Sequence, residues 1–210
     1  MAKLILVRHG KSQWNQLGKW TGKTDVDLIE EGIEEAKQAG AMVCDIDFGC
    51  AYVSSLKRAQ QTLEHMRKTF NADSLEVTSH SALDERDYGI HTGKNKWEVK
   101  EEIGDEEFHK IRRGWDTPIA NGETLKDVYD RVVPYFEENI LQELKKGKNV
   151  LVVAHGNTLR ALIKHLEELS ETRVCELEVG TGEVHCYEID LQGGVRGKEI
   201  RVVNVNKTKV

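Results

Sequence analysis

Two histidines in this chain each follow a short apolar run and precede a glycine. His9 comes after residues 4–7 and Arg8, and His155 comes directly after residues 150–154. A histidine beside an arginine can act as a nucleophile or base towards an anion. Two histidines at one anion site would divide the work of phosphoryl transfer, because one attacks phosphorus while the other donates a hydrogen bond to the transferring oxygens. The alternative is an accident of sequence, since a glycine that begins a helix after a strand is common.

The apolar runs that precede these histidines are typical of buried strands. Residues 4–7 and 150–154 are short, partly β-branched and closely followed by a glycine, as strands of a parallel sheet often are. Proteins of the α/β class bind ligands at the carboxyl edge of the sheet, where such strands end. Neighbouring strands lie about 4.8 Å apart, so His9 and His155 could meet at one edge although they are far apart in the sequence.

Strand and helix patterns alternate along most of the chain, which predicts an α/β fold with a largely parallel sheet. The pattern changes over residues 81–120, where charges crowd in and no strand of the earlier kind is predicted. We expect this excursion to form short helices and loops over one end of the sheet. The predicted helices cover residues 29–40, 56–70, 124–144 and those after Gly156, and the further strands cover 48–53, 75–78, 182–189 and 199–205.

Several of the predicted helices have residues that suit their ends. Asp27 and Glu30 fit a capping box at the start of one helix, and either Ser54 or Ser55 could cap the next one. Pro134 lies inside the longest predicted helix. It should kink or split that helix, because proline lacks a backbone N–H and its ring clashes with the preceding turn.

The composition indicates a single domain over residues 1–210, with 39% hydrophobic residues, two prolines and no low-complexity tract. The formal net charge of −6 argues against a nucleic-acid partner, and no apolar run suits a signal peptide or a membrane span. The four cysteines show neither CxxC pairing nor zinc-ligand spacing, so we expect reduced thiols, no metal and a cytoplasmic protein. An anionic ligand would require positive charge that is concentrated locally.

The segment Arg8-His9-Gly10-x-Ser12-x-Trp14-Asn15 resembles the signature of the histidine phosphatase superfamily, in the form seen in cofactor-dependent phosphoglycerate mutases. The resemblance implies a three-layer α/β/α fold with a mostly parallel central sheet. Seven further stretches match the family in the same order, and with the signature they extend the resemblance to about residue 189. They are residues 21–22 with 25–28, then 55–59, 83–89, 93–96, 112–113, 123–127 and 154–161.

The resemblance implies a catalytic role for five residues. His9 would be the nucleophile that carries phosphate on a ring nitrogen, and it must attack as a neutral imidazole. Arg8 and Arg58 would clamp the phosphoryl oxygens. His155, protonated, would stabilise the transition state. Glu85 would take the proton from the substrate hydroxyl and return it in the reverse direction.

Further residues match family positions that hold the substrate. Lys96, Arg112 and Arg113 match a second anion site, which favours a mutase over a phosphatase. A mutase must retain a bisphosphorylated intermediate and needs an anion site at each end, whereas a phosphatase needs one phosphate site and access for water. The substrate-binding residues that the resemblance implies are Arg8, His9, Gly10, Ser12, Asn15, Thr21, Gly22, Arg58, Glu85, Arg86, Asp87, Tyr88, Lys96, Arg112, Arg113, Gly156 and Asn157.

The activity implied by the resemblance is the interconversion of 3-phosphoglycerate and 2-phosphoglycerate in glycolysis and gluconeogenesis. It would proceed through phosphohistidine, with 2,3-bisphosphoglycerate as the primer, no metal, and small-molecule phosphoglycerates as partners. Two alternatives stay open. One is a phosphomonoesterase on the same scaffold, and the other is a non-catalytic module that binds phosphate or phosphoproteins. The retention of all five catalytic positions speaks against the module.

The chain departs from the family pattern at a few positions. Lys11 stands where an acidic or neutral residue is usual, Lys23 replaces an aromatic residue, and Asp84 stands where Asn is commoner. Residues 119–122 form a loop that is longer in other members and connected there with subunit contacts, so a monomer and a homo-oligomer both stay open. Residues 193–210 do not match closely, and we expect them to form a C-terminal tail.

Overall fold

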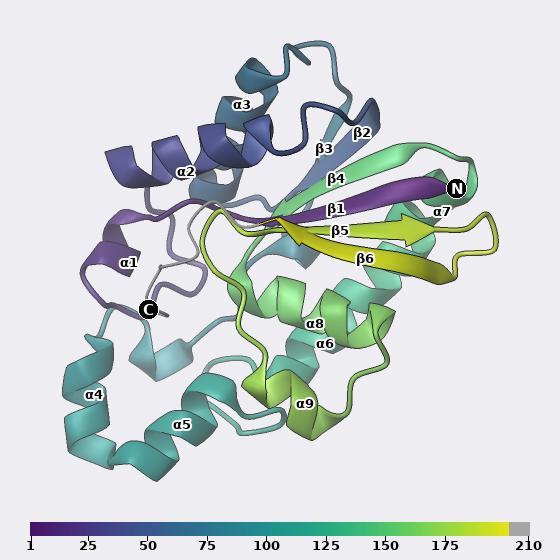
Figure 1. The fold of residues 1–210 in the computed structure, drawn as a ribbon. Coiled ribbons are helices and arrows are strands. Elements are labelled where there is room, and N and C mark those ends of the chain that lie inside the picture. Colours follow the sequence, from purple (N-terminus) through teal and green to yellow (C-terminus); the bar gives the residue numbers. More distant parts are fainter. Residues whose placement is uncertain (202–210) are drawn as a thin grey trace.

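A computed structural model of the chain describes residues 1–201 and builds them around a six-stranded sheet (Figure 1). The strands are β1 (Ala2–Arg8), β2 (Phe48–Val53), β3 (Val77–Ser79), β4 (Asn149–Ala154), β5 (Val184–Ile189) and β6 (Val195–Arg201). They lie in the order β3-β2-β4-β1-β5-β6. The three pairs among β1 to β4 are parallel, and β5 pairs antiparallel with both β1 and β6. The predicted mostly parallel sheet is confirmed.

Helices cover both faces of this sheet and give the predicted three layers. The longer helices are α2 (Glu30–Ala41), α3 (Lys57–Thr69), α6 (Leu125–Tyr135) and α8 (Gly156–Leu166), and the shorter ones are α1 (Gln13–Gln16), α4 (Lys96–Ile103), α5 (Asp105–Arg113), α7 (Leu141–Lys145) and α9 (Glu171–Glu176). Figure 1 shows α2 and α3 on one side of the sheet and α6 and α8 on the other. Each side has its own apolar core.

Strand β1 is central because its side chains serve both cores. Leu4 and Leu6 pack with α6 and α8, whereas Ile5 and Val7 pack with α2 and α3. All four side chains are fully buried, as the period of two along a strand requires when both faces are covered. The apolar run that drew attention in the sequence is therefore buried on both faces.

The register of β1 and β4 brings the two histidines together. Arg8 pairs with Ala154 in this parallel ladder, and the backbone N–H of His9 continues it by donating to the Ala154 carbonyl at 3.0 Å. His9 and His155 therefore leave neighbouring strands at the same level. The prediction that these strands meet at one edge is confirmed.

The loop after His9 lies against the first turn of α2 without room for side chains. A Cβ added at Gly10 would come within 2.2 Å of the Gly32 carbonyl oxygen, and one added at Gly32 would come within 2.1 Å of the Lys11 carbonyl oxygen. Both distances are shorter than any real contact of a Cβ atom. The two glycines thus allow this helix to hold the backbone that follows the histidine.

The excursion over residues 81–120 takes the predicted form. It consists of two 3₁₀ turns, η1 (Ser81–Leu83) and η2 (Gly89–His91), followed by α4 and α5, and it contains no strand. Figure 1 shows α4 and α5 below the end of the sheet, apart from the helices that cover its faces. Pro134 splits the long helix as predicted, because a π-helical segment (Phe136–Ile140) separates α6 from α7.

Both capping predictions were wrong. Helix α2 begins after Ile29, which makes no side-chain cap, while Asp27 accepts a hydrogen bond from Gln61 at 2.8 Å. Helix α3 begins after Leu56, also without a side-chain cap. The hydroxyls of Ser54 and Ser55 bind the Asp84 carboxylate instead. In both places a partner distant in the sequence has taken the capping side chain.

The last predicted strand begins earlier than expected. Strand β6 covers Val195–Arg201, so the segment predicted as a tail from residue 193 begins with a paired strand. Residues 202–205 of the predicted strand, and the rest of the tail, lie outside the described residues. Strand β3 is also shorter than predicted, because it begins at Val77 rather than at residue 75.

Candidate active site

His9 is held so that one ring nitrogen is protonated and the other has a free lone pair. It is 2% exposed, and its Nδ1 lies 2.7 Å from the Gly10 carbonyl oxygen. A carbonyl can only accept, so Nδ1 carries the proton and Nε2 presents its lone pair. Burial and the positive charges of Arg58 and Arg8 hold the pKa of His9 well below its ordinary value. The imidazole is therefore neutral, as a nucleophile must be.

His155 faces His9 across the site. The ring centroids are 4.9 Å apart and the planes are tilted by 59°. His155 is fully buried, and its Nε2 lies 2.7 Å from the Ser54 hydroxyl, while its Nδ1 has no hydrogen-bond partner within residues 1–201. Burial, Arg58 and His9 hold the pKa of His155 well below its ordinary value. The ring is therefore held neutral in the free protein, and negative charge that enters the site favours its protonation.

Two buried arginines flank the histidines. Arg58 donates from Nε to His9 Nε2 at 3.3 Å, and its remaining nitrogens donate to the carbonyls of Thr24 and Gly22 at 3.0 and 2.9 Å. Burial lowers its pKa to about 10. Arg8 donates from Nη1 to the Val179 carbonyl at 2.6 Å, and its buried Nε has no partner in the described chain. Both guanidiniums remain charged at neutral pH and can bind phosphoryl oxygens.

Glu85 lies against the start of the helix that follows His155 and is 8% exposed. Its Oε1 accepts hydrogen bonds from the backbone N–H of Arg86 at 2.8 Å, from the backbone N–H of Asn157 at 3.2 Å, and from Asn157 Nδ2 at 3.1 Å. Asn157 belongs to the first turn of α8, directly after His155 and Gly156. The same helix start therefore positions the carboxylate and the second histidine.

Two arginines outside the set of predicted site residues hold this carboxylate in place. Arg160 donates from Nη1 to Asn157 Oδ1 at 2.8 Å, which turns the Asn157 amide nitrogen towards Glu85. Arg131 donates from Nη2 to the backbone carbonyls of Asp84 and Glu85 at 3.0 and 3.2 Å. Arg160 lies within a stretch that matches the family, and it is a buried charge among Leu159, Ala161 and Leu162; the match was a usable signal. Arg131 had none.

The three residues of the predicted second anion site, Lys96, Arg112 and Arg113, are positively charged and lie close together. Burial, and after it the positive charge of Arg112, lower the pKa of Lys96 to about 8. Burial and Arg113 also lower the pKa of Arg112. Arg113 pairs with the carboxylate of Glu178. The charge of Arg113 lowers the pKa of both Arg8 and Lys96, and the charge of Arg112 lowers that of Lys96. The structure therefore brings these three cations to the same site as Arg8.

Arg86 and Tyr88 lie beside the site in scaffold positions. The Arg86 guanidinium donates to the carbonyls of Glu123 and Ile111 at 2.6 and 3.0 Å, so these hydrogen bonds lead away from Glu85 although the two residues are adjacent. The Tyr88 hydroxyl accepts from Asn157 Nδ2 at 2.9 Å. Arg86 Nη2 is buried and without a partner in the described part of the chain.

The predicted site residues between Ser12 and Gly22 fix the course of the backbone after His9. Ser12 and Asn15 form a capping box on α1, in which Asn15 Oδ1 accepts from the Ser12 hydroxyl at 2.8 Å. The Asn15 amide nitrogen is then the group left to donate. Thr21 is buried, and Gly22 turns the chain with φ +52° so that its carbonyl meets Arg58.

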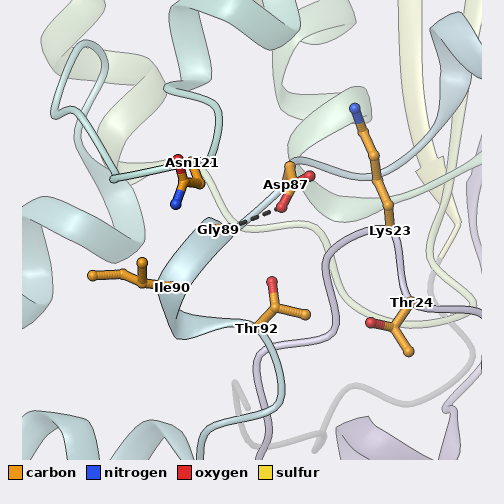
Figure 2. A pocket seen from close by; sticks show the side chains of 7 residues that line it. All are labelled: Lys23, Thr24, Asp87, Gly89, Ile90, Thr92 and Asn121. Atoms are coloured by element: carbon orange, nitrogen blue, oxygen red, sulfur yellow. Dashed lines mark hydrogen bonds between the residues drawn. The ribbon is translucent and has the colours of Figure 1, made fainter.

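Asp87 faces a neighbouring pocket. This open pocket has a volume of about 470 Å³, and Figure 2 shows the Asp87 carboxylate in it, bound to the backbone N–H of Gly89 at 2.9 Å. Neither His9 nor any residue described above as bonded to it lines this pocket. Its lining consists of Lys23, Thr24, Asp87, Gly89, Ile90, Thr92 and Asn121.

Residues 1–201 show neither a metal-binding cluster nor a membrane-spanning helix. They contain no group of three or more His, Cys, Asp or Glu side chains that could hold a metal ion. They also contain no helix both long and apolar enough to cross a membrane. All four cysteines are free thiols.

Comparisons with known proteins agree with this geometry. A family described as the histidine phosphatase superfamily (branch 1) matches residues 4–203. A relative from Parvibaculum lavamentivorans, named 2,3-bisphosphoglycerate-dependent phosphoglycerate mutase, is 43% identical over 201 residues, which cover 95% of this chain and 96% of the relative.

Solved structures share the fold over nearly the whole chain. A protein titled mycobacterial hydrolase 1 superimposes with a TM-score of 0.81 at 21% identity, covering 96% of this chain and 98% of its own. A phosphoserine phosphatase from Entamoeba histolytica, solved in complex with 3-phosphoglyceric acid, superimposes with a TM-score of 0.75 at 26% identity. That match covers 93% of this chain and 94% of the phosphatase.

Proposed function

The chain belongs to the histidine phosphatase superfamily, as its motifs predicted, and from this premise we propose that it is a phosphoglycerate mutase. It interconverts 3-phosphoglycerate and 2-phosphoglycerate, with 2,3-bisphosphoglycerate as the primer, and works in the cytoplasm in glycolysis and gluconeogenesis. Relatives at 38–43% identity over most of the chain carry the name 2,3-bisphosphoglycerate-dependent phosphoglycerate mutase, which supports the proposal.

The gathering of several buried cations around His9 carries this proposal. Arg8 and Arg58 flank His9, while the charge of Arg112 lowers the pKa of Lys96 and the charge of Arg113 lowers that of Arg112. Buried like charges of this kind are stabilised when an anion binds between them. The residues thus suit a ligand with more than one negative group, and a bisphosphate is such a ligand. A simple phosphomonoesterase has no need of the second group.

The side chains around His9 suit phosphoryl transfer to nitrogen. His9 Nε2 presents its lone pair because Nδ1 donates to the Gly10 carbonyl. Arg58 and Arg8 hold the equatorial oxygens, and His155 Nδ1 donates to them once the ring is protonated. The bisphosphate, when bound, supplies the phosphoryl group that loads His9. Because the histidines and arginines provide both the nucleophile and the charge stabilisation, this transfer requires no metal.

Glu85 handles the proton of the substrate hydroxyl. Its Oε1 is occupied by three hydrogen-bond donors, so Oε2 is the oxygen that takes part. In one direction it removes the proton as the hydroxyl oxygen attacks phosphorus on His9, and in the other direction it returns the proton to the leaving oxygen. The substrate is isomerised when His9 gives its phosphoryl group to one hydroxyl and receives one from the other.

A coupled assay of 2-phosphoglycerate formation tests the proposed function. We expect isomerisation of 3-phosphoglycerate to depend on added 2,3-bisphosphoglycerate and to persist in the presence of a chelator, because the proposed chemistry needs a primer and no metal. Rapid hydrolysis of simple phosphate monoesters without isomerisation would establish the phosphomonoesterase instead. Binding of phosphate with neither reaction would establish the non-catalytic module.

Substrate affinity should fall at alkaline pH because of Lys96. Its pKa of about 8 in the free protein means that it is charged below pH 8 and neutral above. The KM for 3-phosphoglycerate should therefore be nearly constant just below pH 8 and rise by up to about tenfold per pH unit above it. Lys96→Met should raise KM about 10- to 100-fold at pH 7 and abolish this rise.

Lys100 provides the matched control for that measurement. It lies in the same helix, is about 40% exposed, and pairs with Asp105 at the surface. Lys100→Met removes the same charge from α4 and should leave both KM and its pH dependence unchanged. If Lys96→Met keeps the alkaline rise in KM, another group causes it and Lys96 is not the anion ligand.

A further inference from the structure

We propose that Ser54 and Asp84 are positioning residues that act on phosphoryl transfer through His155. Ser54 fixes which nitrogen of His155 faces the phosphoryl group, and Asp84 supports the charge that this ring must acquire. The inference rests on phosphoryl transfer at His9, as proposed above, but not on phosphoglycerate being the substrate. Neither residue touches His9.

The partners of the Ser54 hydroxyl show which atom donates in each of its hydrogen bonds. The Ser54 oxygen lies 2.7 Å from Asp84 Oδ1, which can only accept as a carboxylate. The single hydroxyl proton is therefore given to Asp84. The backbone N–H of Leu56 donates to the same oxygen at 3.1 Å, and His155 Nε2 lies 2.7 Å from it. Since the hydroxyl proton is already used, His155 Nε2 must be the donor.

This arrangement leaves Nδ1 of His155 for the reaction. With Nε2–H given to Ser54, Nδ1 is the nitrogen without a partner in the described chain, on a ring whose centroid is 4.9 Å from that of His9. To stabilise the transferring oxygens, Nδ1 must itself carry a proton, so the ring must be an imidazolium. It donates a hydrogen bond and keeps its proton, while the proton of the reacting hydroxyl goes to Glu85.

The charged groups around His155 oppose this protonation. Arg58 from α3, Arg8 from the end of β1, and Arg131 from α6 all act against a positive charge on the ring, as His9 would if it were protonated. The incoming phosphoryl group supplies one opposing negative charge. Asp84 supplies the other through Ser54, because the carboxylate polarises the hydroxyl that accepts from Nε2.

Asp84 is a buried carboxylate that several hydrogen bonds hold in a fixed position. It is 6% exposed, and its carboxylate accepts from the backbone N–H of Ser55 at 2.8 Å as well as from both serine hydroxyls. Its own carbonyl accepts from Thr158 Oγ1 at 2.7 Å. Asp84 therefore connects the serines that follow β2 to the helix that begins after His155. It also directly precedes Glu85.

Ser55 offers a matched control for a test of Ser54. Both hydroxyls bind Asp84, but only that of Ser54 has a hydrogen bond to His155. We would measure single-turnover phosphorylation of His9 in Ser54→Ala, Ser55→Ala and Asp84→Asn, with p-nitrophenyl phosphate as well as with 2,3-bisphosphoglycerate. Thermal melting of each variant reports folding separately.

We expect Ser54→Ala to slow phosphorylation about 10- to 100-fold at saturating substrate, with little change in KM. The deficit should shrink as pH falls, because protons from solvent then compensate for the lost support of the imidazolium. Ser55→Ala should lose about twofold or less. Asp84→Asn keeps an acceptor for Ser54 and loses the charge, so it should lie between the two and show the same pH trend.

Three results would overturn the proposal. They are an unchanged rate in Ser54→Ala, equal losses in Ser54→Ala and Ser55→Ala, or an Asp84→Asn variant as active as the unmodified protein at every pH. If Ser54→Ala does not fold, the isosteric Asp84→Asn still decides the role of the charge. A protein that phosphorylates His9 from p-nitrophenyl phosphate but does not isomerise phosphoglycerate would refute the proposed function and leave this test intact.

Discussion

A His9→Ala variant is expected to form no phosphoenzyme and to lose activity by about 10⁴-fold or more. His9 Nε2 is the nitrogen that the Gly10 carbonyl leaves unprotonated, and it lies beside Arg58. Methyl replaces the nucleophile completely, whereas the buried cations that bind the substrate remain. The measurement is transfer of labelled phosphate from 2,3-bisphosphoglycerate to protein, followed by treatment with acid, because phosphohistidine is acid-labile.

Two other histidines make this experiment specific. His155→Ala removes a hydrogen-bond donor but keeps the nucleophile, so labelled protein should still form, only slowly. His65→Ala changes a histidine of α3 that has no contact with the site in the structure, and it should label at the normal rate. Undiminished acid-labile label in His9→Ala would show that the phosphoryl group is carried by a different residue.

Glu85→Gln should lower the rate of isomerisation by about 10²- to 10⁴-fold. The amide oxygen of glutamine can accept from Asn157 and Arg86 as the carboxylate oxygen does, so the site keeps its shape. Glutamine cannot take a proton from the substrate hydroxyl, and this is the step that should fail. Steady-state isomerisation measures the loss, and thermal melting checks that the fold is intact.

The choice of phosphoryl donor separates this proton transfer from the rest of the chemistry. A nitrophenolate leaving group departs without protonation, so Glu85→Gln should still be phosphorylated on His9 by p-nitrophenyl phosphate at nearly the normal rate. Glu101→Gln, an exposed change on α4, serves as the isosteric control and should affect neither reaction. Equal losses with both donors would mean that Glu85 positions the site and does not transfer protons.

Much of the fold could be predicted because the pattern of the sequence is local. The period of apolar residues located β1, β2, β4 and the helices between them, and the loss of that period located the excursion. The directions of β5 and β6 could not be predicted this way, because an antiparallel strand has the same local pattern as a parallel one. The caps failed for a related reason, since Gln61 and Asp84 compete for Asp27 and the serines from a distance of about 30 residues in the chain.

The residues of the site could also be predicted from local patterns, but their orientations could not. His9 and His155 were predictable because each ends a recognisable strand, and Glu85 because it lies in a matched stretch. What the sequence could not indicate was orientation. Arg86 follows Glu85 directly but donates to backbone carbonyls elsewhere, whereas Arg160, which touches neither histidine, fixes the amide that holds Glu85. The orientation of each arginine depends on which backbone carbonyls, from residues distant in the sequence, lie within hydrogen-bond distance.

The position of β1 in the sheet has a consequence for synthesis of the protein. Both neighbours of β1, β4 and β5, belong to the last third of the chain. At about 5–20 residues per second, a ribosome needs roughly 7–28 s to proceed from β1 to β4. During that interval an apolar strand, buried on both faces in the finished protein, has neither of its partners. Nascent chains that end before β4 therefore expose apolar surface of the kind that chaperones bind. His155, which faces His9, also belongs to this late part of the chain.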